Sequence, residues 1–159
     1  MTAESFFLKT VAAVSVLAEK AGVYALLRAT NARKVTILMY HGITAIQDPV
    51  ANFDGKHIEV AKFERQLEYL LKHYSIISMD DFLAVRKGEK KIPRNSVLLT
   101  FDDGYANCYM HLFPLLKKYK VPAAIFLPTA YTARKDPAWY DAVAYCISQT
   151  KEIEIKLSE

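Results

Sequence analysis

Hydrophobic residues along this chain fall into two patterns, short apolar runs and stripes with helical spacing. The short runs predict buried strands at 35–40, 75–78, 97–101 and within 121–129. The stripes predict amphipathic helices at about 58–74, 78–87, 107–119 and 136–149. Because strands and helices alternate, the pattern indicates an α/β fold with a parallel sheet or barrel. Ligand sites of such folds gather at the C-terminal ends of the strands.

Local signals refine these elements. Ser78 stands three residues before Asp81, which resembles a capping box at a helix start. Pro114 is expected to bend the helix at 107–119, and Pro137 suits the first turn of the last helix. Residues 44–57 are predicted to be a loop with turns at Asp48-Pro49 and Asp54-Gly55. The alternating tail at 151–157 predicts an edge strand.

The N-terminal residues 4–30 are apolar but carry charges. Phe7, Val11, Val14 and Leu17 recur at helical spacing, which predicts one amphipathic helix docked on the domain. A helix lying on a membrane surface is the alternative. The charges leave no run long enough to span a membrane, and Glu4 is the only charged side chain before Lys9, unlike a secretory signal. We expect two units, a helix in residues 1–33 and a domain in residues 34–159. Since neither a membrane span nor a signal peptide is indicated, we expect a cytoplasmic location from the sequence.

Composition narrows the class of protein. The chain has 159 residues, of which 52% are hydrophobic and 24% charged, as in a soluble globular domain. Its net charge of +4 is spread along the sequence, so a nucleic-acid-binding stripe is not indicated. Cys108 and Cys146 do not form a CxxC pair, and we expect both to be small core residues.

Two acidic residues follow a predicted strand in VLLTFDDGYAN, residues 97–107. Neighbouring side chains on a strand point to opposite faces, but Gly104 permits a backbone conformation that other residues resist. Asp102 and Asp103 could therefore face one cavity, where a metal binds one carboxylate and the other acts as a base for the metal's water. The alternative is that one acid caps the next helix and the other is solvated.

The segment LLTFDDGYAN resembles the first signature of the polysaccharide deacetylase family, also called the NodB-homology or carbohydrate esterase family 4 group. Further blocks in the family's order, over roughly residues 34–141, are ILMYHGI, KFERQLEYLLKHYSIISMDDFLA, IPRNSVLLTFDDGY, PLLKKYKVPAAIFLPT and WYD. The resemblance implies a (β/α) barrel of the deacetylase type and a hydrolase that removes acetyl groups from an N-acetylated polysaccharide.

The resemblance also implies roles for individual residues. Asp102 corresponds to the general base and Asp103 to a metal ligand, with zinc as the expected divalent metal. His41, in the family's YH pair, is expected to line the substrate site, as are Gly104 and Tyr105. Family members commonly act on envelope or exported polysaccharides.

One part of the family pattern is missing. The second metal-binding motif, two histidines four positions apart, is not found; His73 and His111 read as ordinary helix residues, and His57 is expected to begin a helix. The chain stops about where that motif would follow, so we expect an incomplete barrel and an incomplete zinc site. The expected consequences are little or no activity and self-association through uncovered apolar surface.

Three other classes of protein share some of these features with the deacetylases. A non-catalytic carbohydrate-binding or structural module would keep the partial fold without the chemistry. A receiver-like phosphoacceptor domain would need a further strand-end acid, whereas Asp80 and Asp81 begin a helix. A short-chain dehydrogenase is suggested by YTARK at 131–135, but no glycine-rich dinucleotide loop precedes it.

Overall fold

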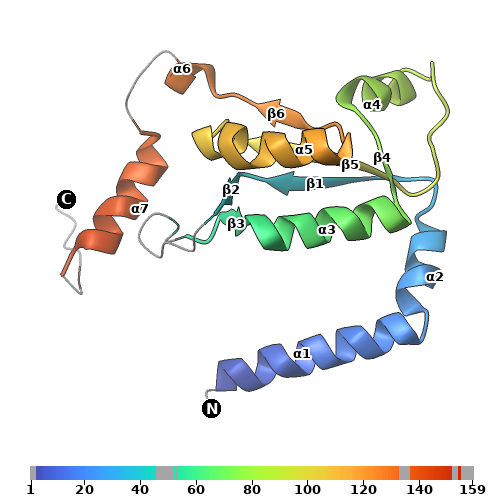
Figure 1. Ribbon diagram of the computed structural model, residues 1–159, viewed down its shortest axis with the longest axis horizontal. Coiled ribbons are helices and arrows are strands. Elements are labelled where there is room, and N and C mark those ends of the chain that lie inside the picture. Colours follow the sequence, from blue (N-terminus) through green and yellow to red (C-terminus); the bar gives the residue numbers. More distant parts are fainter. Residues whose placement is uncertain (1–2, 46–51, 53, 133–136, 152–153, 155–159) are drawn as a thin grey trace.

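A parallel sheet forms the centre of the protein (Figure 1). The computed structural model describes residues 3–45, 52, 54–132, 137–151 and 154. The sheet contains β1 (Val35–Tyr40), β4 (Ser75–Ile76), β5 (Ser96–Asp102) and β6 (Ala124–Phe126). β1 pairs with β5 along its whole length, while β4 and β6 pair with the beginning and the end of β5. Every pair is parallel, which confirms the α/β arrangement expected from the alternating elements.

A second, two-stranded parallel sheet was not predicted. β2 (Gly42–Thr44) pairs with β3 (His57–Glu59) across the expected loop. His57 therefore lies in a strand, and the prediction that it begins a helix is wrong. The turn at Gly55 is confirmed, because its φ is +68° and its N–H donates to the carbonyl of Asn52 at 3.0 Å. The turn expected at Asp48-Pro49 lies outside the described residues.

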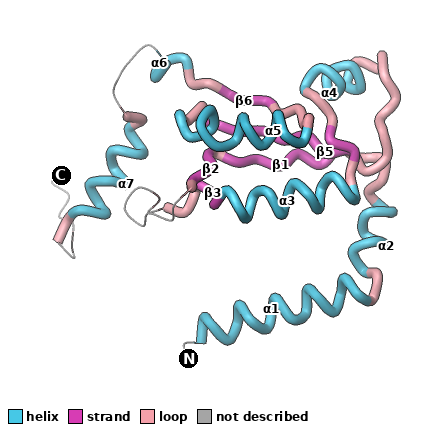
Figure 2. The backbone as a smooth tube through the Cα atoms, viewed as in Figure 1, coloured by secondary structure: helices cyan, strands magenta, loops and turns pink. Residues whose placement is uncertain are grey.

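Helices cover one face of the main sheet, as the tube in Figure 2 shows. α3 (Val60–His73) and the consecutive η1 (Cys108–Leu112) and α5 (Phe113–Tyr119) supply this layer. Tyr40 stacks on Phe101 with ring centroids 5.2 Å apart. The buried side chains between sheet and helices are Ile43, Phe63, Leu67, Leu70, Val97, Leu99, Phe101, Cys108, Leu112, Leu115 and Val121. Alternate β5 residues supply this core because neighbouring strand side chains point to opposite faces.

Pro114 changes the geometry of its helix. Residues 108–112 form a π-helix, and the regular α-helix begins only at Phe113, with Pro114 in its first turn. The physical reason is that proline has no N–H to donate to the preceding turn. A bend was expected here, and the structure shows a change of helix type.

Of the remaining helices, α4 and α7 were predicted, whereas α6 was not. α4 (Met79–Arg86) begins with the expected capping box: the Asp81 N–H donates to Ser78 Oγ at 3.1 Å. α6 (Thr129–Thr132) is a single turn, and α7 (Trp139–Gln149) starts two residues after Pro137. Pro137 is thus outside the first turn, contrary to expectation. The predicted edge strand at 151–157 falls mostly outside the described residues.

The N-terminal segment differs most from its prediction. It forms α1 (Ala3–Lys20) and α2 (Val23–Thr30), not one helix, because Gly22 between them has a φ of +76°. The stripe Phe7, Val11, Val14 and Leu17 is exposed, so the expected docking on the domain is wrong. Within the described residues no single helix is long and apolar enough to cross a membrane; residues 9–20 and 23–30 together meet that test, bent by 72°.

The two cysteines have different environments. Cys108 is buried in the core, as predicted. Cys146 is exposed, which corrects the prediction that both are core residues. The reason is that α7 has no buried residue and packs only loosely on the rest of the protein.

Candidate functional site

The acid pair lies at the carboxyl end of β5. Asp102 is the last residue of the strand, and Asp103 and Gly104 both have left-handed backbone conformations, with φ of +68° and +63°. The Gly104 N–H donates to the carbonyl of Asp102 at 2.9 Å, which closes a tight turn. Both acids line one hollow of about 670 Å³ on the sheet face opposite the helical core. Two left-handed residues after the strand thus end the alternation of side chains and bring both acids to one hollow.

Gly104 is also required for close packing. A Cβ at this position would lie 2.1 Å from Leu127 Cδ2. Leu127 follows β6 and lines the same hollow as the two acids. The glycine therefore allows the acidic turn to approach the end of β6.

Tyr140, near the start of α7, contacts the second acid. Its hydroxyl donates a hydrogen bond to the Asp103 carboxylate. Burial, and after it this hydrogen bond, raises the pKa of Tyr140 to about 12. Tyr140 therefore stays a neutral donor near neutral pH and orients the Asp103 carboxylate.

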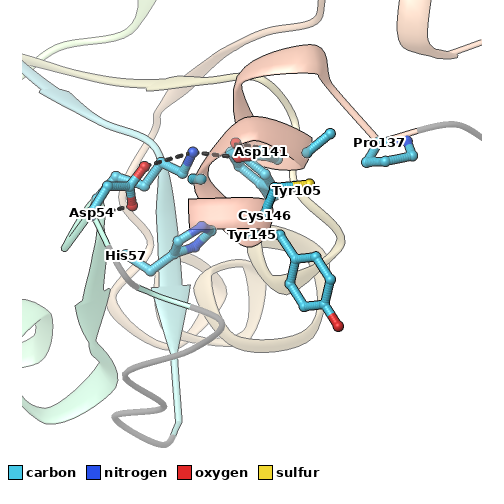
Figure 3. Close-up of a pocket in the computed structure, with 10 residues that line it drawn as sticks. Asp54, His57, Tyr105, Pro137, Asp141, Tyr145 and Cys146 are labelled. Atoms are coloured by element: carbon cyan, nitrogen blue, oxygen red, sulfur yellow. Dashed lines mark hydrogen bonds and ion pairs between the residues drawn. The ribbon is translucent and has the colours of Figure 1, made fainter. Parts of the chain in front are cut away.

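A cluster of charged and polar side chains lies beside α7 (Figure 3), and one of its members, Tyr105, follows Asp103 by two residues. Tyr105 donates to both oxygens of Asp141, at 3.0 and 2.9 Å. The Lys56 ammonium pairs with Asp141 and, at 2.9 Å, with Asp54. Burial alone would lower the pKa of Lys56, but its hydrogen bonds to Asp141 and Asp54 outweigh burial and raise that pKa. The cluster joins three segments: the residues just before β3, the turn that follows β5, and α7.

These side chains border a second cavity of about 500 Å³. Asp54, Lys56, His57 and Tyr105 line it together with residues of α7, including Asp141, Tyr145 and Cys146 (Figure 3). The pKa of Tyr105 lies well above its usual value, first because of burial and then because Asp141 accepts its proton in a hydrogen bond. Tyr105 is therefore a hydrogen-bond donor and not an acid under ordinary conditions.

His57 is fixed by neighbours from three segments. Its Nδ1 lies 2.7 Å from the Asn107 amide nitrogen, and its ring meets the edge of Tyr105 at 4.7 Å between centroids. Gly42 passes so close that a Cβ there would lie 2.1 Å from Nδ1. Burial, followed by the charge of Lys56, lowers the pKa of His57. The ring is therefore neutral at neutral pH and accepts the Asn107 hydrogen bond through Nδ1.

His41 follows β1 directly. Since Tyr40 pairs with Phe101, His41 emerges from the sheet at the same level as Asp102. Its carbonyl accepts a hydrogen bond from Cys108 Sγ at 3.3 Å. Among the described residues His41 lines neither of the two hollows, whereas Asp102 and Asp103 share one and Tyr105 lines the other.

The described residues do not form a complete metal site. Within them, no group of three or more histidine, cysteine, aspartate and glutamate side chains is arranged to hold an ion. Zinc in proteins usually takes three or four such ligands. The donor set seen around Asp103 is therefore too small to fit zinc by itself.

Sequence reasoning missed several residues of this region. Lys56 and Asp54 were not proposed as site residues, and Tyr140 and Asp141 were noted only within the WYD block. The sequence around Lys56 gave little indication that it belongs to the site, because its partner Asp141 lies 85 residues away in the chain. The side-by-side aromatic and acidic residues of WYD were the one available sign that α7 contributes to the site.

Comparison with known proteins gives consistent matches. Residues 89–153 match the family model described as polysaccharide deacetylase. The chain is 34% identical over 97 residues to Bacillus subtilis YxkH, named as a polysaccharide deacetylase, which covers 59% of this chain and 32% of that protein. It is 32% identical over 80 residues to the Staphylococcus aureus poly-β-1,6-N-acetyl-D-glucosamine N-deacetylase, covering 50% of this chain and 27% of that protein.

A solved structure shows the same relationship. The Streptococcus pyogenes deacetylase PplD, in complex with acetate, is 26% identical, with a TM-score of 0.56 over 67% of this chain and 48% of its own. The chain spans about a third or less of the length of the curated relatives it matches. Its parallel sheet is accordingly an incomplete version of the deacetylase (β/α) barrel, as the sequence predicted. Over the matched part of its sequence the chain is similar to polysaccharide deacetylases, and it spans only part of the length of these relatives.

Proposed function

We propose that this chain carries the general base of a hydrolase that removes N-acetyl groups from a polysaccharide. The observation that supports it best is the shared hollow at the end of β5, which both Asp102 and Asp103 line. Carboxyl ends of parallel strands are where α/β enzymes collect their reacting groups. Residues 34–159 would form the deacetylase-like unit, and residues 1–33 a separate helical segment.

Asp102 is the proposed base. It would take a proton from the water that attacks the acetamide carbonyl, after which the C–N bond breaks to give acetate and a free amine. Asp103 would be the carboxylate that this chain contributes to a divalent metal, with zinc as the expected ion, and Tyr140 would orient it. Since the described residues do not fit a whole zinc site, we expect weak metal binding and little activity from the 159-residue chain alone.

The proposed substrate is a polymer of N-acetylated sugars. The support comes from the Staphylococcus aureus relative, which is named for poly-β-1,6-N-acetyl-D-glucosamine. His41, Gly104 and Tyr105 remain the proposed substrate-binding residues. The Tyr105 hydroxyl is already bonded to Asp141, so this residue would present its ring rather than a free donor.

The test combines binding with acetate release. The chain is incubated with a short oligomer of β-1,6-linked N-acetylglucosamine and excess zinc, and acetate is measured with Asp102→Asn and Asp81→Asn as matched variants. We expect slow release that Asp102→Asn reduces by at least about 100-fold and Asp81→Asn leaves unchanged. Release that does not depend on Asp102 would refute its role as the base.

A second candidate is a carbohydrate-binding module without catalysis. The small number of metal-binding side chains grouped in the described part of the chain favours it. It predicts that the oligomer shifts backbone amide resonances around the hollow, at 102–105 and 126–128, with no acetate formed at any zinc concentration. Absence of both binding and release would reject both candidates.

A further inference from the structure

We propose that α1 is a membrane-surface helix whose apolar stripe binds anionic lipid. The stripe consists of Phe7, Val11, Val14 and Leu17, which recur every three or four residues and so share one side of the helix. Their exposed fractions lie between 46% for Val11 and 68% for Leu17, and Phe6 beside them is 62% exposed. Exposed apolar area gathered on one helix is unusual for a soluble surface and indicates a binding face.

The placement of α1 leaves this stripe open. Figure 1 shows α1 set apart from α3 and the sheet, running back below α3 and joined to the rest of the protein through α2. The helix has 18 residues, and at 1.5 Å per residue it is about 27 Å long. Gly22 then turns the chain, so that α1 and α2 meet at a bend of 72° between residues 9–20 and 23–30. Helices bent in this way can lie in the interface of a bilayer with their apolar sides inward.

The apolar surface continues onto α2. Val23, Leu26 and Leu27 are also exposed, at 44% to 67%. The bend therefore does not end the apolar surface, and both helices can contribute to one contact with lipid.

Charge identifies the partner. The first 34 residues contain five basic residues against two acidic ones, and the basic ones are Lys9, Lys20, Arg28, Arg33 and Lys34. Basic side chains near an anionic bilayer each add to binding, and their long stems allow the charge to reach the headgroups. A second copy of the chain would bring the same positive excess against itself. Anionic lipid offsets this excess, so it is the occupant that the stripe and the charges fit together.

A matched pair of double variants tests the proposal. Val14→Gln with Leu17→Gln changes the stripe, while Ala12→Gln with Ser15→Gln introduces the same residues, at the same spacing, at positions of α1 outside the stripe. Neither pair alters charge, and glutamine is a good helix former. Binding of the whole chain is measured by co-sedimentation with vesicles of phosphatidylcholine containing roughly one third phosphatidylglycerol, and with vesicles of phosphatidylcholine alone, at about 0.15 M salt.

We expect the unchanged chain to bind the anionic vesicles and to bind much less to the neutral ones. The stripe variant should bind at least about tenfold more weakly, because two aliphatic side chains that would enter the lipid are lost. The variant Ala12→Gln with Ser15→Gln should bind within about twofold of the unchanged chain. Equal melting temperatures for all three proteins would show that folding is not the cause.

Three results would overturn the proposal. The first is no binding to anionic vesicles, and the second is equal loss in both variants. The third is a vesicle-bound chain that resists extraction with alkaline carbonate, which would mean that the bent pair spans the bilayer. Sedimentation velocity is run in parallel. Three observations together would show that a second copy of the chain covers the stripe and that the lipid proposal is wrong. These are that the unchanged chain self-associates, that only the stripe variant abolishes this self-association, and that no vesicle binding occurs.

Discussion

The Tyr105 hydroxyl donates to both carboxylate oxygens of Asp141, at 3.0 and 2.9 Å. This contact connects the turn that follows the acid pair to α7, which otherwise has no buried residue. Asp141 also pairs with Lys56, so one carboxylate joins three segments that are distant in sequence. The position of α7, and with it the contact between Tyr140 and Asp103, depends on this cluster.

Removal of the Asp141 charge should loosen α7. In Asp141→Asn the half-buried Lys56 keeps only Asp54 as an ionic partner, and Tyr105 loses a charged acceptor. The side chains of Lys56 and Asp141 are only 16% and 25% exposed, so we expect the free energy of unfolding to fall by about 1–3 kcal/mol. Urea titration measures it, and amide exchange should show faster exchange in residues 139–149. Glu89→Gln, in an exposed loop, is the control and should change stability very little.

The half-buried His57 predicts a dependence of stability on pH. Burial lowers the pKa of His57 below its ordinary value of 6.5, so the unfolded chain binds a proton more readily than the folded one. This contribution is complete above about pH 6.5 and is lost as the pH falls from there toward the lowered pKa. Melting temperatures between about pH 7.5 and 5.5 measure the loss.

The His57→Gln variant isolates that contribution. It should lose less stability than the unchanged protein over the same fall in pH, because no partly buried imidazole ring remains to be protonated. His111→Gln, on η1, should keep the full dependence. A His57→Gln protein that follows the unchanged protein at every pH would show that His57 is not responsible.

Gly42 should not tolerate a side chain. A Cβ there would lie 2.1 Å from His57 Nδ1 and 2.7 Å from Asn107 Oδ1, both of which are held in place by their mutual contact. We expect Gly42→Ala to destabilise the protein by about 1–3 kcal/mol, measured by chemical denaturation. Adding His57→Ala to Gly42→Ala should recover part of the loss. Gly88→Ala is the comparison, since it meets only open space and carries the cost of its left-handed backbone alone.

A pH titration of the Tyr140 hydroxyl can detect its hydrogen bond to Asp103. With carbon-13 at the tyrosine ring carbon that bears the hydroxyl, NMR should show Tyr140 still protonated at about pH 11, since its pKa is raised to about 12. In Asp103→Asn the pKa should fall but remain above its ordinary value, because burial is the larger cause. Asp102→Asn, the neighbouring acid, should leave the Tyr140 titration in place. The reverse pattern would mean that Tyr140 faces Asp102.

Apolar side chains of the hollow predict self-association. Ile37, Met39, Phe126 and Leu127 line it and are each more than half exposed. Sedimentation velocity should show an average mass that rises with concentration, and Met39→Lys with Phe126→Lys should return it toward one chain. Tyr109→Lys with Phe113→Lys changes exposed aromatic residues elsewhere and should have no such effect. A clean single species for the unchanged protein at every concentration would contradict this prediction.

Local patterns in the sequence determined the strands and most helices. The period of apolar residues identified α3 and β5, the Ser78 and Asp81 pair identified the start of α4, and the strand-end position of Asp102 and Asp103 was visible directly. Each of these depends on residues within one turn or one strand, where spacing alone sets which side chains face the core. The resemblance to polysaccharide deacetylases was also visible, because the matching blocks are short and ordered along the chain.

Tertiary structure decided what lies around the acids. The β2–β3 pair, the Lys56 to Asp141 bridge and the Tyr140 contact join segments separated by many residues, and no periodicity encodes which distant partner a side chain meets. The N-terminal stripe shows the converse: its spacing was correctly read as a helix face, but a left-handed Gly22 directed it away from the core. Spacing determines that a face is apolar, whereas long-range packing determines what, if anything, covers it.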